Sequence, residues 1–182
     1  MENRNTTAQK MTSSISHPPS SREIRVANRQ RTKRVNTRFL KQIVTEFFTE
    51  LQITEAELGI QLVGEKEMAR VNWQFLQHEG STDVITFDHL EKRKAKSGKQ
   101  RKFHGELFIC VNVAVKQAKE FKTSWQAELV RYVVHGVLHL LGYDDLQPAL
   151  RRQMKREENR RMRWLARRFA LAQLARPANM AA

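Results

Sequence analysis

The sequence predicts an α+β fold: a single domain in which a small mixed β-sheet packs against helices. Short strand patterns are interspersed with stretches of helical apolar periodicity, and the two do not follow a regular βαβ repeat. The chain has 182 residues and 40% apolar content, which is enough for one compact domain of ordinary size. These observations favour an α+β sandwich.

The first half of the chain contains three predicted strands and two predicted helices. Apolar and β-branched residues mark the strands, and the helices repeat apolar residues every three or four positions. Asn36 or Thr37 can cap the first helix by accepting a backbone hydrogen bond. In chain order, these elements span residues 23–27, 36–51, 58–63, 65–76 and 82–87.

The second half begins with a basic stretch, 92–102, that is predicted to be a loop between strands. A strand over 105–113 and a short helix over 114–121 follow. Ser124 or Thr123 can cap the next helix. The last helix can start at Pro148, because proline is tolerated in the first helical turn. Its apolar stripe consists of Leu150, Met154, Leu165 and Phe169.

The predicted domain spans residues 23–174, with tails at 1–22 and 175–182. The first tail is rich in Ser, Thr, Asn and Pro and has no apolar run, so it is expected to be disordered and neither a signal peptide nor a membrane anchor. No stretch approaches the length of a transmembrane helix. Cys110 is the one cysteine; we expect it to be a buried strand residue of a protein in the reducing cytoplasm.

The net charge of +14 is concentrated in three segments. Residues 22–41 carry eight basic and one acidic side chain, residues 92–102 carry seven and none, and residues 149–176 carry ten and two. Such patches are typical of proteins that follow a phosphate backbone, although solvated helix faces and a loop can produce the same counts. On charge alone, a polyanionic partner is therefore the favoured interpretation.

The most specific chemical pattern of the chain lies at its second-last predicted helix. His135 and His139 are four residues apart, so on a helix both imidazoles point to the same side. A helix can end in a left-handed turn at Gly142, and the chain can then bring Asp145 back toward the rings. Two His and one carboxylate with an open position form a transition-metal site of catalytic type. Two satisfied core histidines are the alternative.

Gly136 stands beside the first His, where metalloproteases of the His-Glu-x-x-His type carry the Glu that serves as general base. A glycine cannot accept a proton from water, which counts against proteolysis. A zinc hydrolase of another class and a non-haem iron oxygenase remain alternatives, because both use His and carboxylate ligands.

With these motifs in place, the chain resembles the YbeY family of bacterial metallo-endoribonucleases. Residues 135–144 match the family's helix motif His-Gly-x-Leu-His-Leu-x-Gly-x-Asp-His. Residues 82–87 are similar to its Thr-Asp-Val-Leu-Ser-Phe strand, and residues 105–109 to its Gly-Asp-Ile-x-Ile strand. Residues 65–72 match its acidic-x-x-Met-x-x-x-Asn helix. The motifs follow in the family's order, and the likeness covers about residues 23–165.

The resemblance implies a single-strand-specific endoribonuclease in 16S rRNA 3′-end maturation and late-stage 70S ribosome quality control. It implies one metal ion per chain, Zn²⁺ or another divalent ion, held by His135, His139 and Asp145. No catalytic residue is implied beyond this metal centre. The implied partners are ribosomal RNA and the ribosome, with no membrane. An RNA-binding ribosome assembly factor with a structural metal is the alternative.

Two positions depart from the family pattern. The third ligand of the family is usually His, whereas Asp145 stands here; Asp144 is a second candidate, which the family's register leaves as a helix-end cap or an acceptor behind the ligands. Many members also carry an Arg shortly after the Asn of the 65–72 motif. Here residues 71–81 contain no Lys or Arg.

The candidate RNA-binding residues are one His and a group of basic side chains. His78 is the nearest substitute for the missing Arg. Trp73 and Trp125 could stack on unpaired bases, but their helical spacing predicts packing positions. The basic candidates are Lys92, Arg93, Lys94, Arg101 and Lys102.

Overall fold

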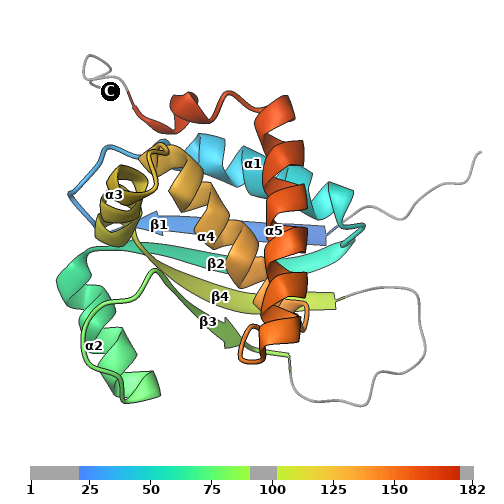
Figure 1. Cartoon of the computed structure of the whole chain (residues 1–182). Helices are drawn as coiled ribbons and strands as arrows, with labels where there is room; N and C mark the ends of the chain where they lie inside the picture. Colours follow the sequence, from blue (N-terminus) through green and yellow to red (C-terminus); the bar gives the residue numbers. More distant parts are fainter. Residues whose placement is uncertain (1–20, 91–101, 177–182) are drawn as a thin grey trace, which may run out of the picture.

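The computed structural model describes residues 21–90 and 102–176, except for the side chain of Lys102. Four strands, five α-helices and one 3-10 helix occur in this part of the chain (Figure 1). In order, they are β1 (Ser21–Asn28), α1 (Thr37–Glu50), β2 (Glu55–Val63), α2 (Glu65–Leu76), β3 (Val84–Asp88), β4 (Lys102–Cys110), α3 (Val111–Glu120), α4 (Trp125–Leu140), α5 (Pro148–Arg168) and η1 (Leu171–Leu174).

The four strands form one mixed sheet in the order β1-β2-β4-β3. The pairs β1–β2 and β2–β4 are parallel, while β3 runs antiparallel to β4. A mixed sheet packed with helices confirms the predicted α+β class.

Helix α4 occupies the centre of the fold, between the sheet and α5 (Figure 1). Helices α1 and α4 cover the sheet face that carries Leu58, Ile60 and Leu107, all with 0% exposure. On the opposite face, α2 buries Met68 and Val71 in a smaller cluster with residues of β3 and β4. Because α4 packs against the sheet on one side and against α5 on the other, the backbone positions of its residues are fixed between them.

The predicted starts of α1, α4 and α5 are confirmed. The Asn36 side chain, not that of Thr37, caps α1 by accepting from the backbone N–H of Phe39 at 3.1 Å. Ser124 caps α4 by accepting from the N–H of Ala127 at 3.2 Å. Helix α5 starts at Pro148.

The predicted strand over 105–113 was too long. Strand β4 ends at Cys110, and residues 111–113 form the first turn of α3. The β-branched residues in this turn favoured a strand on propensity alone. In the helix, Val111, Ala114 and Ala118 share one buried face, and this tertiary burial outweighs the local preference. Cys110 is fully buried, as expected.

Parts of both predicted tails belong to the folded domain. Ser21 and Arg22 are in β1, where they pair with β2. At the other end, Ala175 forms a β-bridge with Val35. Tail residues 1–20 and 177–182, together with residues 91–101, lie outside the described residues. Within the described ranges, none of the helices has the length and apolarity to cross a membrane.

Candidate metal centre

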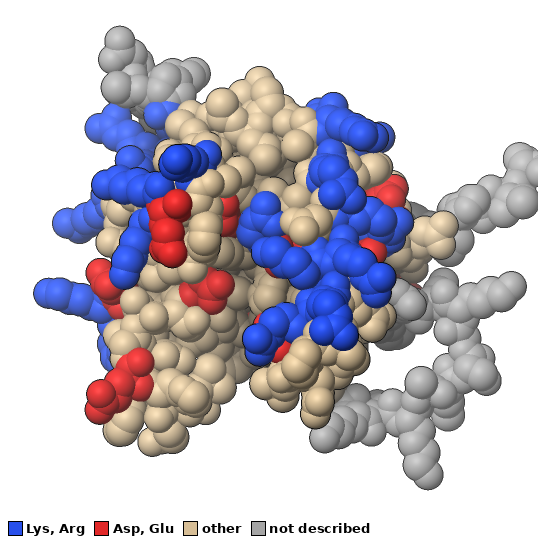
Figure 2. Space-filling model, in the orientation of Figure 1, with Lys and Arg blue, Asp and Glu red and all other residues tan. Residues whose placement is uncertain are grey.

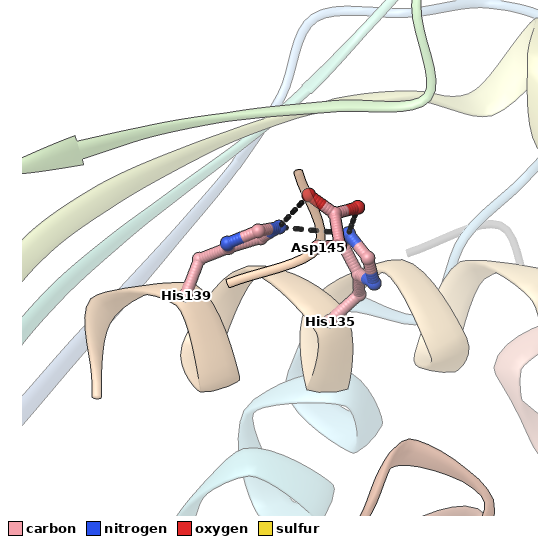
Figure 3. A group of neighbouring side chains, drawn as sticks. All are labelled: His135, His139 and Asp145. Carbon is pink, nitrogen blue, oxygen red and sulfur yellow. Dashed lines mark hydrogen bonds and ion pairs between the residues drawn. The ribbon is translucent and has the colours of Figure 1, made fainter. Parts of the chain in front are cut away.

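Helix α4 carries His135 and His139 on the side that faces a short loop after its C-terminus (Figure 3). Their rings meet edge to face at an angle of 78°, with centroids 4.6 Å apart. Both side chains are partly buried, with 21% and 26% of their surface exposed. The spacing of four residues therefore brings the two imidazoles together, as predicted.

The loop is shaped by Gly142, whose φ of +91° lies in the left-handed region that favours glycine. The N–H of Gly142 donates to the carbonyl of His139 at 2.8 Å, and the N–H of Tyr143 donates to that of Leu138 at 3.0 Å. This pair of bonds is a Schellman motif, which ends the helix and reverses the chain. The predicted left-handed turn at this glycine is thus present, and it returns Asp145 to the rings.

The three side chains converge on one point (Figure 3). The Nε2 atoms of His135 and His139 are 3.0 Å apart. The Asp145 carboxylate lies 3.9 Å from each of them, with Oδ2 toward His135 and Oδ1 toward His139. One ligand atom from each residue lies within 4.8 Å of the others, so the group could hold a single metal ion.

The outer nitrogens of both rings face acceptors. Nδ1 of His135 is 3.0 Å from Oε2 of Glu158, and Nδ1 of His139 is 3.0 Å from the carbonyl oxygen of Tyr143. In each neutral ring, the proton is therefore assigned to Nδ1 and the lone pair to Nε2. Two lone pairs that face each other at 3.0 Å repel unless a cation lies near both, which is what a metal site requires.

Asp144 has a different place from Asp145. Its Oδ1 accepts from the backbone N–H groups of Asp145 at 2.7 Å and Leu146 at 3.1 Å. This side chain therefore stabilises the turn in which the candidate ligand lies. Arg151 adds to the support of the loop, because its Nε donates to the carbonyl of Asp145 at 2.9 Å.

Glu158, on α5, is the residue at this centre that the sequence analysis missed. It is 4% exposed and accepts from Arg131 Nη1 at 2.6 Å as well as facing His135. Burial by itself raises the pKa of this carboxyl, but hydrogen bonds from His135 and Arg131 outweigh it and lower the pKa to about 2. Its spacing in the sequence could have indicated this burial, since Glu158 lies four residues from both Met154 and Met162, which are buried on the same side of the helix.

A pocket of about 300 Å³ opens beside the three side chains and gives a reactant access to them. Its other walls come from the end of α2 and from β3 and the residue before it. Asp83 is among them, and its Oδ1 accepts from the N–H of Val84 at 2.8 Å. No Lys or Arg lines this pocket within the described ranges. The lining residues are Leu76, Asp83, Val84, Ile85, Thr86, His135, His139 and Asp145.

Among the candidate RNA-binding residues, only His78 has a side chain that the structure describes. His78 is exposed and is not among the lining residues. Lys92, Arg93, Lys94 and Arg101 lie outside the described residues, as does the side chain of Lys102. These five residues remain candidates from the sequence alone.

One packing prediction was wrong. Trp73 is 52% exposed on α2, because its helix position points away from the face that buries Met68 and Val71. Trp125 is partly buried and packs against the main core, as predicted.

Comparison with known proteins identifies the family. A family model described as "Endoribonuclease YbeY" matches residues 25–166. The chain belongs to the YbeY family. The matched range includes β2, β3, β4, helices α1 to α4 and α5 as far as Ala166, and it contains the three residues of the candidate metal centre. The expected class, a hydrolase that acts on RNA, is therefore confirmed at the level of the family.

Individual relatives carry the same description. The Endoribonuclease YbeY of Salinibacter ruber is 38% identical over 103 residues, which cover 56% of this chain and 66% of that relative, about two thirds of its length. The Endoribonuclease YbeY of Bacteroides fragilis is 30% identical over 128 residues, which cover 70% of this chain and 84% of that relative.

A solved structure shares the fold of this YbeY-family chain. It is a solution structure of a Thermotoga maritima protein, with a TM-score of 0.58 and 22% sequence identity. The superposition covers 87% of this chain and 99% of that one. At this identity, the likeness supports the architecture and is silent on chemistry.

Proposed function

We propose that this protein is a metal-dependent endoribonuclease that cleaves single-stranded RNA in the 3′-end maturation of 16S rRNA and in late-stage 70S ribosome quality control. The observation that carries the proposal is the pair of bare Nε2 atoms, 3.0 Å apart, with the Asp145 carboxylate beside them in an open pocket. A nuclease of this kind acts in the cytoplasm, where its RNA substrates are made.

The donor set fits Zn²⁺, one ion per chain. Three protein ligands of imidazole and carboxylate type, with space left for a fourth, are typical of catalytic zinc, and a harder divalent ion is the alternative. When bound there, such an ion polarises a phosphoryl oxygen and makes a water molecule more acidic. The carboxylate of Asp145, where the family usually has His, reduces the net positive charge of the centre and so weakens this effect.

Residues around the pocket fix the three candidate ligands in place and form an apolar wall that excludes bulk water on one side. His135 and His139 are fixed through their Nδ1 atoms, and Asp145 is fixed through the turn that Asp144 caps. Val84, Ile85 and Leu76 supply an apolar wall against which a ribose or base can lie. The arrangement accommodates attack on the phosphorus by water or by the neighbouring 2′-hydroxyl.

The basic surface of α5 supports an RNA substrate (Figure 2). Lys and Arg side chains gather along this helix in the view shown. Within the described ranges, no ion pair engages Arg152, Arg156, Arg163 or Arg167, all of which are exposed. Exposed arginines without an ion-pair partner can contact phosphates. Such contacts position a strand without reading its bases.

Exposed apolar residues at the end of α2 support a preference for single strands. Trp73, Phe75 and Leu76 are 52%, 55% and 50% exposed, and Leu76 also lines the metal pocket. Trp73 lies one helical turn before Leu76 on α2, and an exposed indole at this place can stack on an unpaired base, whereas paired bases are not accessible to it.

One observation favours a second candidate, an RNA-binding assembly factor with a structural metal. The described pocket walls lack a basic side chain that could steady a phosphate beside the metal. A defined single-stranded RNA separates the two functions. An endoribonuclease cleaves it in a metal-dependent way, and Asp145→Asn lowers the rate; an assembly factor binds it without cleavage. Elemental analysis of the same preparations identifies the ion.

A further inference from the structure

Glu158 contacts the His135 ring at Nδ1, the nitrogen on the side opposite the candidate metal position. Its Oε2 is 3.0 Å from Nδ1 of His135. Its Oε1 accepts from Nη1 of Arg131 at 2.6 Å and from Nζ of Lys155 at 3.2 Å. Both oxygens are therefore engaged, and the carboxylate is held in place by three separate side chains on two helices.

The position of this carboxylate is not explained by packing. Met154 and Met162, four residues before and after Glu158, are buried on the same side of α5. An apolar side chain would continue this stripe, and replacing a buried ion pair by apolar residues is often neutral or stabilising. The buried side of α5 thus has a charged residue, Glu158, at the position next to His135, where an apolar residue would continue the pattern.

We propose that Glu158 is a positioning residue of the metal centre: it keeps the proton of His135 on Nδ1 and directs the Nε2 lone pair toward His139 and Asp145. The inference rests on the proposed function only in that a metal ion binds these three residues. A carboxylate behind a ligating imidazole fixes the ring and makes its free nitrogen a better electron donor.

The two rings are supported unequally. His139 donates to a neutral backbone carbonyl, that of Tyr143, whereas His135 donates to a carboxylate. A charged acceptor holds the shared proton more strongly than a neutral one. The Nε2 atom of His135 is therefore the stronger electron donor of the two toward a metal ion. Removing the carboxylate that accepts from its Nδ1 is expected to weaken metal binding measurably.

The matched control is the neighbouring residue, Glu157. It is also a glutamate of α5, but it bonds to Arg160 and Arg161 and does not contact His135. The Kd for Zn²⁺ is measured by chelator competition on metal-free protein. We expect Glu158→Gln to raise the Kd by about 10–100-fold and Glu157→Gln to leave it at the wild-type value.

A second readout tests positioning directly. In mildly alkaline solution, ¹⁵N NMR of the metal-free protein reports which ring nitrogen of His135 carries the proton. We expect the proton on Nδ1 in the wild type and a mixture of both tautomers in Glu158→Gln, because an amide oxygen is a weaker acceptor than a carboxylate. A merely structural role would lower stability and leave the tautomer unchanged.

A folded Glu158→Gln protein with the wild-type Kd and the wild-type tautomer overturns the proposal. If Glu158→Gln does not fold, Glu158→Asp keeps the charge but withdraws it by one methylene; unchanged zinc affinity in that variant overturns the proposal as well. Neither readout uses RNA. Absence of RNA cleavage by the wild type therefore refutes the proposed function without deciding the role of Glu158.

Discussion

Gly136 of α4 lies so close to Leu107 of β4 that no side chain fits between them. A Cβ at residue 136 would be 2.7 Å from Cδ2 of Leu107 and 3.3 Å from Cγ2 of Thr86. Four residues later the arrangement is reversed, since a Cβ at Gly105 of β4 would be 2.7 Å from Cδ1 of Leu140. In each of these two contacts, a glycine of one element faces a leucine of the other. This pairing allows the metal-bearing helix to pack closely on the sheet. The same contact leaves no room for the Glu that a His-Glu-x-x-His peptidase carries.

Replacing Gly136 by Ala is expected to destabilise the protein by about 1–3 kcal/mol, because Leu107 is fully buried and cannot move freely. The free energy of unfolding in urea measures this cost. Gly64→Ala is the control, since the nearest atom to a Cβ there is 3.7 Å away and its φ is −88°. Equal stability of the two variants would contradict the close packing of α4 on β4.

Replacing His139 by Ala is expected to remove metal binding and RNA cleavage together. The variant takes away one of the two Nε2 atoms and leaves two ligands, which are too few for a catalytic zinc site. Bound metal is measured by elemental analysis and cleavage on a defined RNA. His104→Ala, a partly exposed His of β4 outside the pocket, should retain both. Cleavage by a metal-free His139→Ala protein would refute the catalytic role of the centre.

Replacing Trp73 by Ala is expected to weaken binding of single-stranded RNA by about 1–3 kcal/mol, the usual contribution of stacking on one base. Fluorescence anisotropy with a labelled oligonucleotide measures the change. Phe121→Ala is the control, because this ring is also exposed, at 59%, but stands at the end of α3, whereas Trp73 lies on α2 one helical turn before the pocket residue Leu76. If both variants bind RNA equally well, Trp73 is an ordinary surface residue.

The exposed arginines of α5 are expected to set the salt dependence of RNA binding. Each phosphate contact on a single strand adds about 0.7 to the slope of log K against log salt, so Arg152→Gln with Arg156→Gln should lower its magnitude by roughly 1.4. Lys116→Gln with Lys119→Gln on α3 removes the same charge from exposed positions elsewhere. A slope in the Arg152 and Arg156 double variant equal to that of the wild type would exclude these positions from the RNA-binding surface.

Acid is expected to remove the stabilising contribution of Glu158. Because its folded pKa is lowered to about 2, below that of an unfolded glutamate near 4.5, its contribution is complete above pH ~4.5 and is lost as the pH falls toward 2. The difference in unfolding free energy between wild type and Glu158→Gln should therefore shrink over this interval. A difference that is constant from neutral pH to pH ~2 would mean that Glu158 keeps an ordinary pKa in the fold.

Much of the candidate site was predictable because it is local in the chain. His135 and His139 face the same side through helix geometry alone, and the left-handed turn at Gly142 follows from the freedom of glycine at positive φ. Asp145 was separated from Asp144 only by the family's register. The structure adds the physical reason, since Asp144 is engaged in capping the turn.

Other features were decided where segments distant in sequence meet. Local preference favoured a strand at 111–113, and Trp73 was assigned to packing, because single-sequence spacing does not reveal which helix face meets the sheet. Glu158 lies 23 residues after His135, and no spacing rule connects two helices that cross.

By itself, the sequence determined the α+β class, the two imidazoles on one face of a helix with a turn and a carboxylate after them, and the basic character of the last helix. These properties depend on periodicity, turn chemistry and composition, which act over a few residues. Only the tertiary structure decided that a buried carboxylate supports His135 and that Gly136 faces Leu107. These contacts arise from the packing of α4 between α5 and the sheet, and the free energy of such packing depends on all three elements together.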